Sequence, residues 1–167
     1  MALFVARLVL TLWAVLTFRL TLGPSLAIAG VQPDLAAALV FYIALARGAT
    51  FGIIGGFLMG LLVDVDHPLG LGVSSLAWST MSLVVSRLSE AIDTRDPVLG
   101  SFLLFLAVLL AETVKVPFIG GYDPSRFALV WLRWSLPTAL YTAVAVPLLV
   151  AGAHAVMGEK RWLGGRS

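Results

Sequence analysis

Residues 48–64 read GATFGIIGGFLMGLLVD, an apolar stretch in which every fourth residue is a glycine until the series ends on an aspartate. The series is Gly48, Gly52, Gly56, Gly60 and Asp64. Four-residue spacing places neighbours on one ridge of an α-helix, which winds slowly because a turn holds about 3.6 residues. Glycines on such a ridge allow another helix backbone to approach closely, as in the small-xxx-small packing of membrane helices. The stretch therefore predicts a membrane helix with a tight packing surface and a carboxylate at its end.

The overall composition is that of an integral membrane protein. Of 167 residues, 60% are hydrophobic and only 12% are charged, and the mean hydropathy is +1.01. Repeated apolar runs separated by short polar turns are typical of membrane-spanning chains. The net charge of +2 comes from basic residues scattered at the ends of these runs, which indicates a role in topology and not nucleic-acid binding. The absence of cysteine excludes disulfides and thiolate chemistry.

Hydropathy and turn signals predict an all-α bundle of about six membrane spans. The expected segments are 3–22, 33–46, 49–63, 69–88, 97–117 and 127–156. The second and third segments are short compared with the roughly 20 residues of a full span. In the sixth, we expect an interfacial stretch, a break at Pro137 and then a span. We assign residues 1–157 to one transmembrane domain and residues 158–167 to a short basic tail.

The basic residues predict the orientation of the bundle. An even number of spans places both termini on one side of the membrane. The basic residues expected on that side are Arg47, Arg87, Arg95, Lys160, Arg161 and Arg166, and those on the other side are Arg19, Lys115, Arg126 and Arg133. The positive-inside rule then places both termini and the basic tail in the cytoplasm.

Asp64, Asp66 and His67 form the cluster that most resembles a reactive site. It could bind a cation, relay protons or hold a substrate amine. The alternative is a polar turn that ends the third segment. We favour the turn, because Asp-His-Pro is a good breaker sequence and no further histidine or cysteine pattern completes a metal site.

The other charged residues of the apolar segments have structural readings that we prefer. Asp34 stands near the start of the second segment, where a carboxylate commonly stabilises a helix N-terminus. Glu112 and Lys115 are three residues apart and can pair on one helix face, which lowers the cost of holding charges near hydrocarbon. We expect Asp34, Asp64, Glu112 and Lys115 to set helix conformation. We favour a structural pair of Glu112 and Lys115 over a transport relay.

Two further motifs have a structural interpretation that needs no bound ligand. Trp131, Arg133 and Trp134 are typical of an interfacial anchor. The glycine series indicates helix packing and not phosphate binding, because no strand precedes it and no GK[ST] sequence follows. The chain lacks the G-x-S-x-G, H-E-x-x-H and D-x-x-D-G patterns, so we expect a protein that is not an enzyme, with no catalytic, cofactor-binding or metal-binding residues.

Three blocks of the sequence together resemble a known family. They are QPDL at 32–35, GGFLMGLLVD at 55–64 and PLGLG at 68–72. Their order and spacing resemble the bacterial rod shape-determining protein MreD family, which shows a Pro-Asp-Leu opening of its second helix, a Gly-Phe-x-x-Gly-Leu-x-x-Asp run and a following Leu-Gly pair. The residues that carry the resemblance are Pro33, Asp34, Gly56, Phe57, Gly60, Asp64 and Gly70.

The resemblance implies a multi-pass protein of the bacterial inner membrane that acts as a scaffold of the cell-elongation machinery and of lateral peptidoglycan synthesis. Its implied partner is the single-span protein MreC, which would connect it to MreB filaments, RodA and the transpeptidase of RodA. The implied fold is similar to the six-helix substrate-binding subunits of energy-coupling-factor transporters. Membrane lipid is expected as a partner and nucleic acid is not.

The expected packing surface has two possible occupants. Gly48, Gly52, Gly56, Phe57 and Gly60 could hold their helix against a neighbour within the chain or against a partner. A second functional hypothesis is a small-molecule-binding subunit of an energy-coupling-factor-type transporter, because short, glycine-interrupted spans can mark a substrate site in a membrane.

Overall fold

The computed structural model describes residues 30–65, 70–90, 96–118 and 127–157, together with single residues at 17, 21, 27, 94, 123 and 125. Side chains are described as far as residue 151. Most of the expected first span and all of the basic tail lie outside this part, as do Asp66 and His67. The regular elements of the described part are all helical, in agreement with the predicted all-α fold.

The first two described helices are joined by a single residue. Helix α2 (Leu35–Arg47) begins at Asp34, whose side chain accepts a hydrogen bond from the backbone N–H of Ala37. Helix α3 (Ala49–Asp64) follows directly after Gly48. Gly48 has φ 83° and ψ −179°, a conformation that is essentially restricted to glycine, so this position allows the abrupt reversal between the two helices.

Helices α4 (Val73–Leu88) and α5 (Pro97–Lys115) also begin at recognisable caps. Gly72 precedes α4 with φ 90°, in the left-handed region. Asp96 caps α5 by accepting a hydrogen bond from the N–H of Val98, and Pro97 occupies the first turn, where its missing N–H costs nothing. A single 3₁₀ turn, η3 (Val116–Phe118), extends α5.

The last helical segment is continuous through the proline at which a break was expected. It consists of α6 (Phe127–Val130), a π-helical turn η5 (Trp131–Ser135) and α7 (Leu136–Met157). In η5, the N–H of Leu136 bonds to the carbonyl of Trp131, five residues earlier. Pro137 has no N–H for the carbonyl of residue 133, and its ring would clash with that carbonyl in an α-helix. Widening the preceding turn accommodates the proline, so the expectation of a break at Pro137 was wrong.

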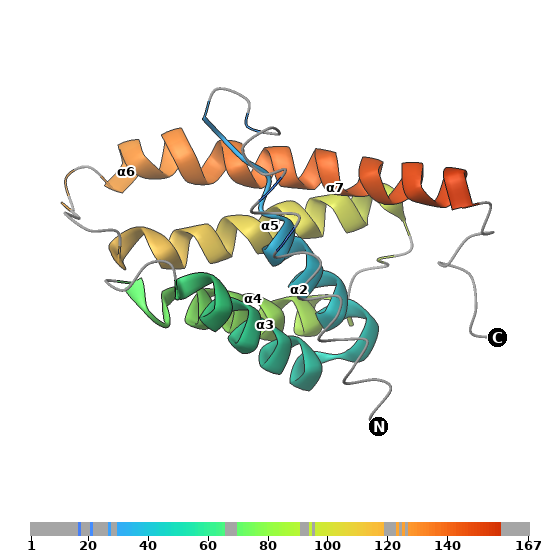
Figure 1. Ribbon diagram of the computed structural model, residues 1–167, viewed down its shortest axis with the longest axis horizontal. Coiled ribbons are helices and arrows are strands. Elements are labelled where there is room, and N and C mark those ends of the chain that lie inside the picture. The colour runs from blue at the N-terminus through green and yellow to red at the C-terminus, as the bar shows by residue number, and fades with distance from the viewer. Residues whose placement is uncertain are drawn as a thin grey trace.

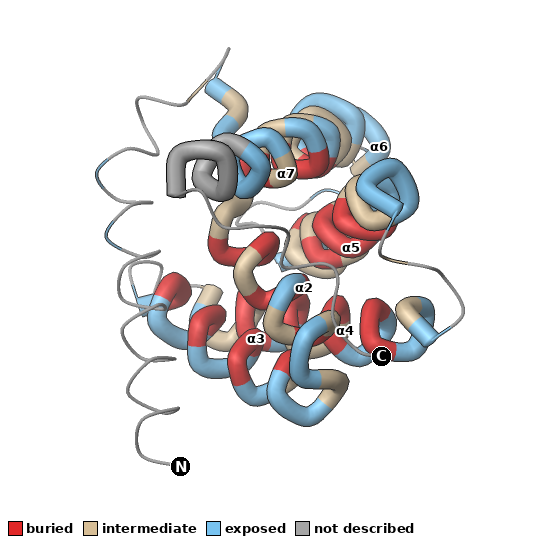
Figure 2. Tube along the Cα trace, turned by 90° about the vertical axis from the view of Figure 1, so that its right-hand side faces the viewer, coloured by how far each residue is buried: buried red, intermediate tan, exposed pale blue. Residues whose placement is uncertain are grey.

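The helices form two groups that α4 connects. Helices α2, α3 and α4 pack together, while α5 and α7 form a long pair, and α4 lies against α5 (Figure 1). The buried residues line the sides of the helices that face one another (Figure 2). The largest fully buried side chains are Phe41, Met59, Trp78, Met81, Leu103 and Leu104.

Two of the described helical segments are long and apolar enough to cross a membrane. They are Pro97–Phe118 and Phe127–Ala151, with mean hydropathies of 2.1 and 1.5. The apolar helices Leu35–Arg47 and Ala49–Asp64 are shorter. At about 1.5 Å per residue, the 16 residues of α3 extend about 24 Å, less than the roughly 30 Å of a bilayer core.

Candidate functional site: the glycine face and the carboxylate end

Three glycines of α3 lie in close contact with neighbouring helices, and two of them, Gly56 and Gly60, lie against the backbone of α4. We call Gly52, Gly56 and Gly60 the glycine face. A Cβ atom at Gly56 would lie 2.9 Å from the carbonyl oxygen of Trp78, and one at Gly60 would overlap the backbone of Ser75. Both contacts are with main-chain atoms, which cannot turn aside as a flexible side chain can. The close approach of α3 and α4 therefore depends on the absence of side chains at these positions.

The glycine face also reaches α2. A Cβ atom at Gly52 would lie 2.7 Å from the Cβ of Ala44 in α2 and 3.0 Å from the Cβ of Ser82 in α4. Gly52 thus occupies the junction of three helices. Gly48 does not belong to this face, because nothing lies within 4 Å of a Cβ placed there and its role is in the reversal between α2 and α3.

Serine hydroxyls of α4 donate hydrogen bonds to main-chain carbonyls of α3. Ser75 Oγ donates to the carbonyl of Phe57 at 3.0 Å, and Ser82 Oγ donates to the carbonyl of Gly52 at 3.0 Å. Between them, Ser79 Oγ donates to the carbonyl of residue 53 at 3.3 Å. A glycine-rich helix leaves its carbonyls accessible to a close neighbour, so the hydroxyls reinforce the same contact that the glycines permit.

These serines were missed in the sequence analysis, although the sequence carries a signal for them. Serine occurs at positions 75, 79, 82, 86 and 89, with spacings of four, three, four and three residues. Such spacing places small polar side chains along one side of a helix. A serine stripe in an apolar segment next to a glycine series is the pattern of two membrane helices that pack on each other.

Phe57 lies apart from the glycine face. Its side chain is 52% exposed, and its helix neighbours Gly56 and Gly60 are buried. The structure therefore separates the residues that were grouped as one packing surface: three glycines face the interior, Gly48 forms the reversal, and Phe57 points outward.

Asp64 holds the first turn of α4. Its Oδ2 atom accepts hydrogen bonds from the N–H groups of Gly72 and Ser74, both at 2.9 Å, and a longer one of 3.5 Å from Ser75. Only 4% of Asp64 is exposed. The first N–H groups of a helix have no partner within the helix, and a carboxylate satisfies them while complementing the helix dipole. Asp64 at the end of α3 thus caps α4, the next described helix along the chain.

Asp34, Glu112 and Lys115 form a three-residue ionic network. Lys115 Nζ lies 2.8 Å from Glu112 Oε1 on the same helix and 3.2 Å from Asp34 Oδ2 at the start of α2. The side chains are 19%, 9% and 19% exposed for Lys115, Asp34 and Glu112. The expected pair of Glu112 and Lys115 is present, and Asp34 joins it from a segment 81 residues away in the sequence.

Further contacts tie this network to the surrounding helices. The backbone N–H of Asp34 donates to Thr142 Oγ1 of α7 at 2.8 Å, and Lys115 Nζ lies 4.9 Å from the ring centroid of Trp78 in α4. The cation therefore meets an aromatic face as well as two carboxylates. Through Asp34 and Lys115, the network connects α2, α4, α5 and α7.

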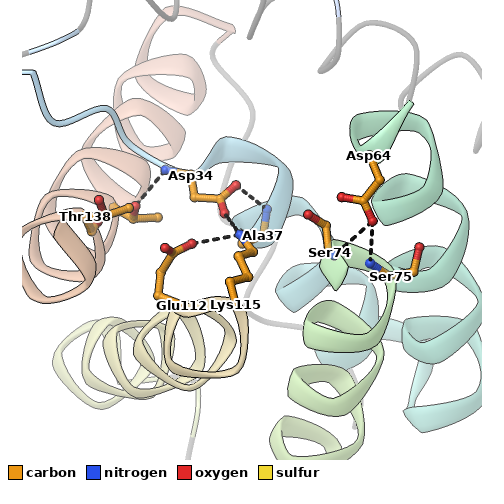
Figure 3. A network of polar contacts seen from close by, with 9 residues as sticks. Asp34, Ala37, Asp64, Ser74, Ser75, Glu112, Lys115 and Thr138 are labelled. Carbon is orange, nitrogen blue, oxygen red and sulfur yellow. Dashed lines mark hydrogen bonds and ion pairs between the residues drawn. The ribbon is translucent and has the colours of Figure 1, made fainter. Parts of the chain in front are cut away.

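The ionic network and the Asp64 cap lie at the same end of the bundle. Figure 3 shows Asp34, Glu112 and Lys115 beside the first turn of α2, with Asp64 and the first turn of α4 on the adjacent helices. We call Asp34, Asp64, Glu112 and Lys115 the carboxylate end. In the part of the chain that the structure describes, no group of three or more metal-ligating side chains could hold an ion. The cluster of Asp64, Asp66 and His67 cannot be described as a unit, because the last two lie outside that part.

The comparison with family models identifies the chain. The model of the rod shape-determining protein MreD matches residues 2–153. The chain belongs to the MreD family. No curated protein and no solved structure matches it significantly. The family match extends well beyond residues 32–72, which hold the three blocks on which the resemblance in the sequence rests.

The MreD family is one of rod-shape-determining membrane proteins that act in the shape-determining complex. It is a structural family and is not known for catalysis. The residues that carry the MreD resemblance occur at helix starts, helix ends and the α3–α4 contact: Asp34 and Asp64 at two caps, Gly56 and Gly60 on the glycine face. Phe57 is the MreD motif residue of α3 that faces away from the bundle interior.

Proposed function

We propose that this MreD-family chain is a non-enzymatic membrane scaffold of the bacterial cell-elongation machinery. It binds the membrane span of an MreC-like partner and through that partner joins MreB, RodA and the transpeptidase of RodA in lateral peptidoglycan synthesis. Family membership supports a role in rod shape. The scaffold, its partner and its place in the inner membrane are our proposal.

One observation supports the scaffold interpretation: the carboxylates of the motif and the serines of α4 join helices of the same chain. Asp64 caps α4, Asp34 caps α2 and pairs with Lys115, and the serines of α4 bond to α3. Side chains that hold a bundle together in this way provide a rigid body. A rigid body suits a protein whose task is to present a surface to a partner.

The glycine face is occupied within the chain, so we assign the partner to an outward helix face. On α3, that face carries Phe51, Ile54, Phe57, Leu58 and Leu61, each at least 41% exposed. In a bilayer, helix association gains little from the hydrophobic effect and depends on close packing. The α3 helix is shorter than the bilayer core, a mismatch that favours association with another helix. Phe57 is the motif residue on this face, which makes it our preferred contact.

We also propose that the bundle has six spans, with the first formed by residues 3–22, and that residues 158–167 are a cytoplasmic basic tail. Both termini would then be cytoplasmic, and the carboxylate end would lie at the outer boundary of the membrane. Cysteine accessibility tests this arrangement. A cysteine at position 166 should react with an impermeant maleimide only after the cells are opened, and one at position 123 should react in intact spheroplasts.

The experiment that tests the partner is reconstitution of the purified chain with a full-length MreC-like protein and, separately, with the same protein without its membrane span. The two chains should elute together only when the span is present. Phe57→Ala should weaken the complex, whereas Phe102→Ala should not. Phe102 is a matched control, since it is 55% exposed on α5. Equal co-elution with the span-free partner would overturn the proposed mode of binding.

A further inference from the structure

The π-helical turn η5 is fixed at the carboxylate end of the bundle. Trp131 Nε1 donates a hydrogen bond to Thr113 Oγ1 of α5 at 2.8 Å, and Thr113 stands two residues before Lys115. Ser135, at the end of η5, is buried. The turn is therefore anchored at both of its ends, and the residues between them project from a defined position.

The three residues between these anchors are all exposed. Leu132 is 62% exposed and Trp134 is 48% exposed, and the side chain of Arg133 is exposed as well. Arg133 enters neither of the two ion pairs found among the described residues, whereas Lys115 enters both. A guanidinium at the boundary of an apolar helix is a strong donor for planar anions such as phosphate.

An apolar stripe continues from this turn along α7. Leu140, Val144 and Leu148 follow one another at four-residue spacing and are 58%, 54% and 66% exposed. Residues with this spacing share one face of a helix. Arg133 lies seven residues before Leu140, on the exposed side of the π-turn from which α7 continues. Arg133 therefore lies at one end of an exposed apolar surface that is long enough for an acyl chain.

We propose that this surface binds an anionic phospholipid. Arg133 contacts the phosphate, Trp134 lies among the headgroups with its indole N–H toward the polar side, and an acyl chain runs along Leu140 and Val144. Charge complementarity favours an anionic headgroup over a zwitterionic one, and the apolar stripe favours a lipid over free phosphate. This site is separate from the surface that we assign to the protein partner.

The test is lipid retention on the purified full chain, measured by native mass spectrometry with phosphatidylglycerol and phosphatidylcholine of identical chains. The wild type should retain more phosphatidylglycerol. Arg133→Gln should lower that retention about fivefold and leave phosphatidylcholine unchanged, as expected for the loss of one cation near a membrane surface. Arg133→Lys should keep part of the preference, and Arg87→Gln, an exposed arginine in the last turn of α4, should keep all of it.

Elution volume checks that each variant is folded. We expect Arg133→Gln to fold like the wild type, because Arg133 is exposed. Equal phosphatidylglycerol retention by the wild type and Arg133→Gln would overturn the proposal. So would an equal loss in Arg87→Gln, which would indicate a diffuse charge effect. Displacement of the lipid by millimolar inorganic phosphate would contradict the proposed contact between the acyl chain and the apolar stripe of α7.

Discussion

The Oδ2 atom of Asp64, at the end of α3, lies 2.9 Å from the backbone nitrogen of Ser74 in the first turn of α4. The same oxygen accepts a hydrogen bond from the N–H of Gly72. One carboxylate therefore fixes the register between two helices whose backbones meet along the glycine face. The register matters because the backbone of Ser75 can lie this close to α3 only opposite a residue without a side chain, which is Gly60.

Asp64→Ala should destabilise the bundle by about 3 kcal/mol, because buried N–H groups would lose a charged acceptor. The matched control is Asp96→Ala, which removes an exposed cap of α5 and should cost only about 1 kcal/mol. The free energy of unfolding in a detergent titration measures both. Equal losses of unfolding free energy in the two variants would show that burial of Asp64 adds nothing to the stability that its cap provides.

Gly60→Ala should destabilise the α3–α4 contact by about 2 kcal/mol or more, since the new methyl group would overlap the backbone of Ser75. Gly55→Ala is the control, because a Cβ there meets Ile43 Cδ1 at an ordinary 3.6 Å. That variant should be neutral or slightly stabilising, as alanine is the better helix former. Apparent melting temperatures in detergent compare the two, and a Gly60→Ala protein as stable as Gly55→Ala would refute the tight contact.

Replacing Ser75, Ser79 and Ser82 together by alanine should cost about 2 kcal/mol, because hydrogen bonds between membrane helices contribute about 0.6 kcal/mol each on average. The loss should therefore be comparable to that of the single Gly60→Ala change. A far larger loss in the triple variant would mean that hydrogen bonding, and not backbone packing, dominates this contact. The detergent titration used for Asp64 measures this variant as well.

Lys115→Met should destabilise the protein by about 3 kcal/mol or more, because it leaves two partly buried carboxylates without their cation. Adding Asp34→Asn and Glu112→Gln to Lys115→Met should restore much of the loss. The measurement is the free energy of unfolding of the single and triple variants. If the triple variant were less stable than Lys115→Met, the carboxylates would be stabilised by something other than Lys115.

The sequence predicted those parts of the fold that local patterns encode. The glycine series and its terminal Asp64 predicted a tightly packed helix, and the 32–35 block predicted the start of α2 at Asp34. The π-turn was not predicted, because Pro137 signals a disturbance without saying whether the helix ends or widens. The ion pair between Asp34 and Lys115 was also not predicted, since no local pattern relates residues 81 positions apart.

The separation of Phe57 from the glycine face could have been foreseen in part. Position 57 directly follows Gly56, and adjacent residues on a helix point about 100° apart. The family motif places both residues in one block of sequence, which obscured this difference. Only the packing of α2 and α4 shows which side of α3 is covered, because nearly every residue of α3 is apolar.

The most direct test of the scaffold is recovery of the tagged chain from native membranes in mild detergent, followed by mass spectrometry of everything that accompanies it. We expect to recover an MreC-like protein and the elongation synthases, RodA and its transpeptidase, at higher levels than with an unrelated tagged membrane protein. Recovery of an ATPase module with its coupling subunit, without cell-wall synthesis proteins, would contradict the scaffold and favour a transporter subunit.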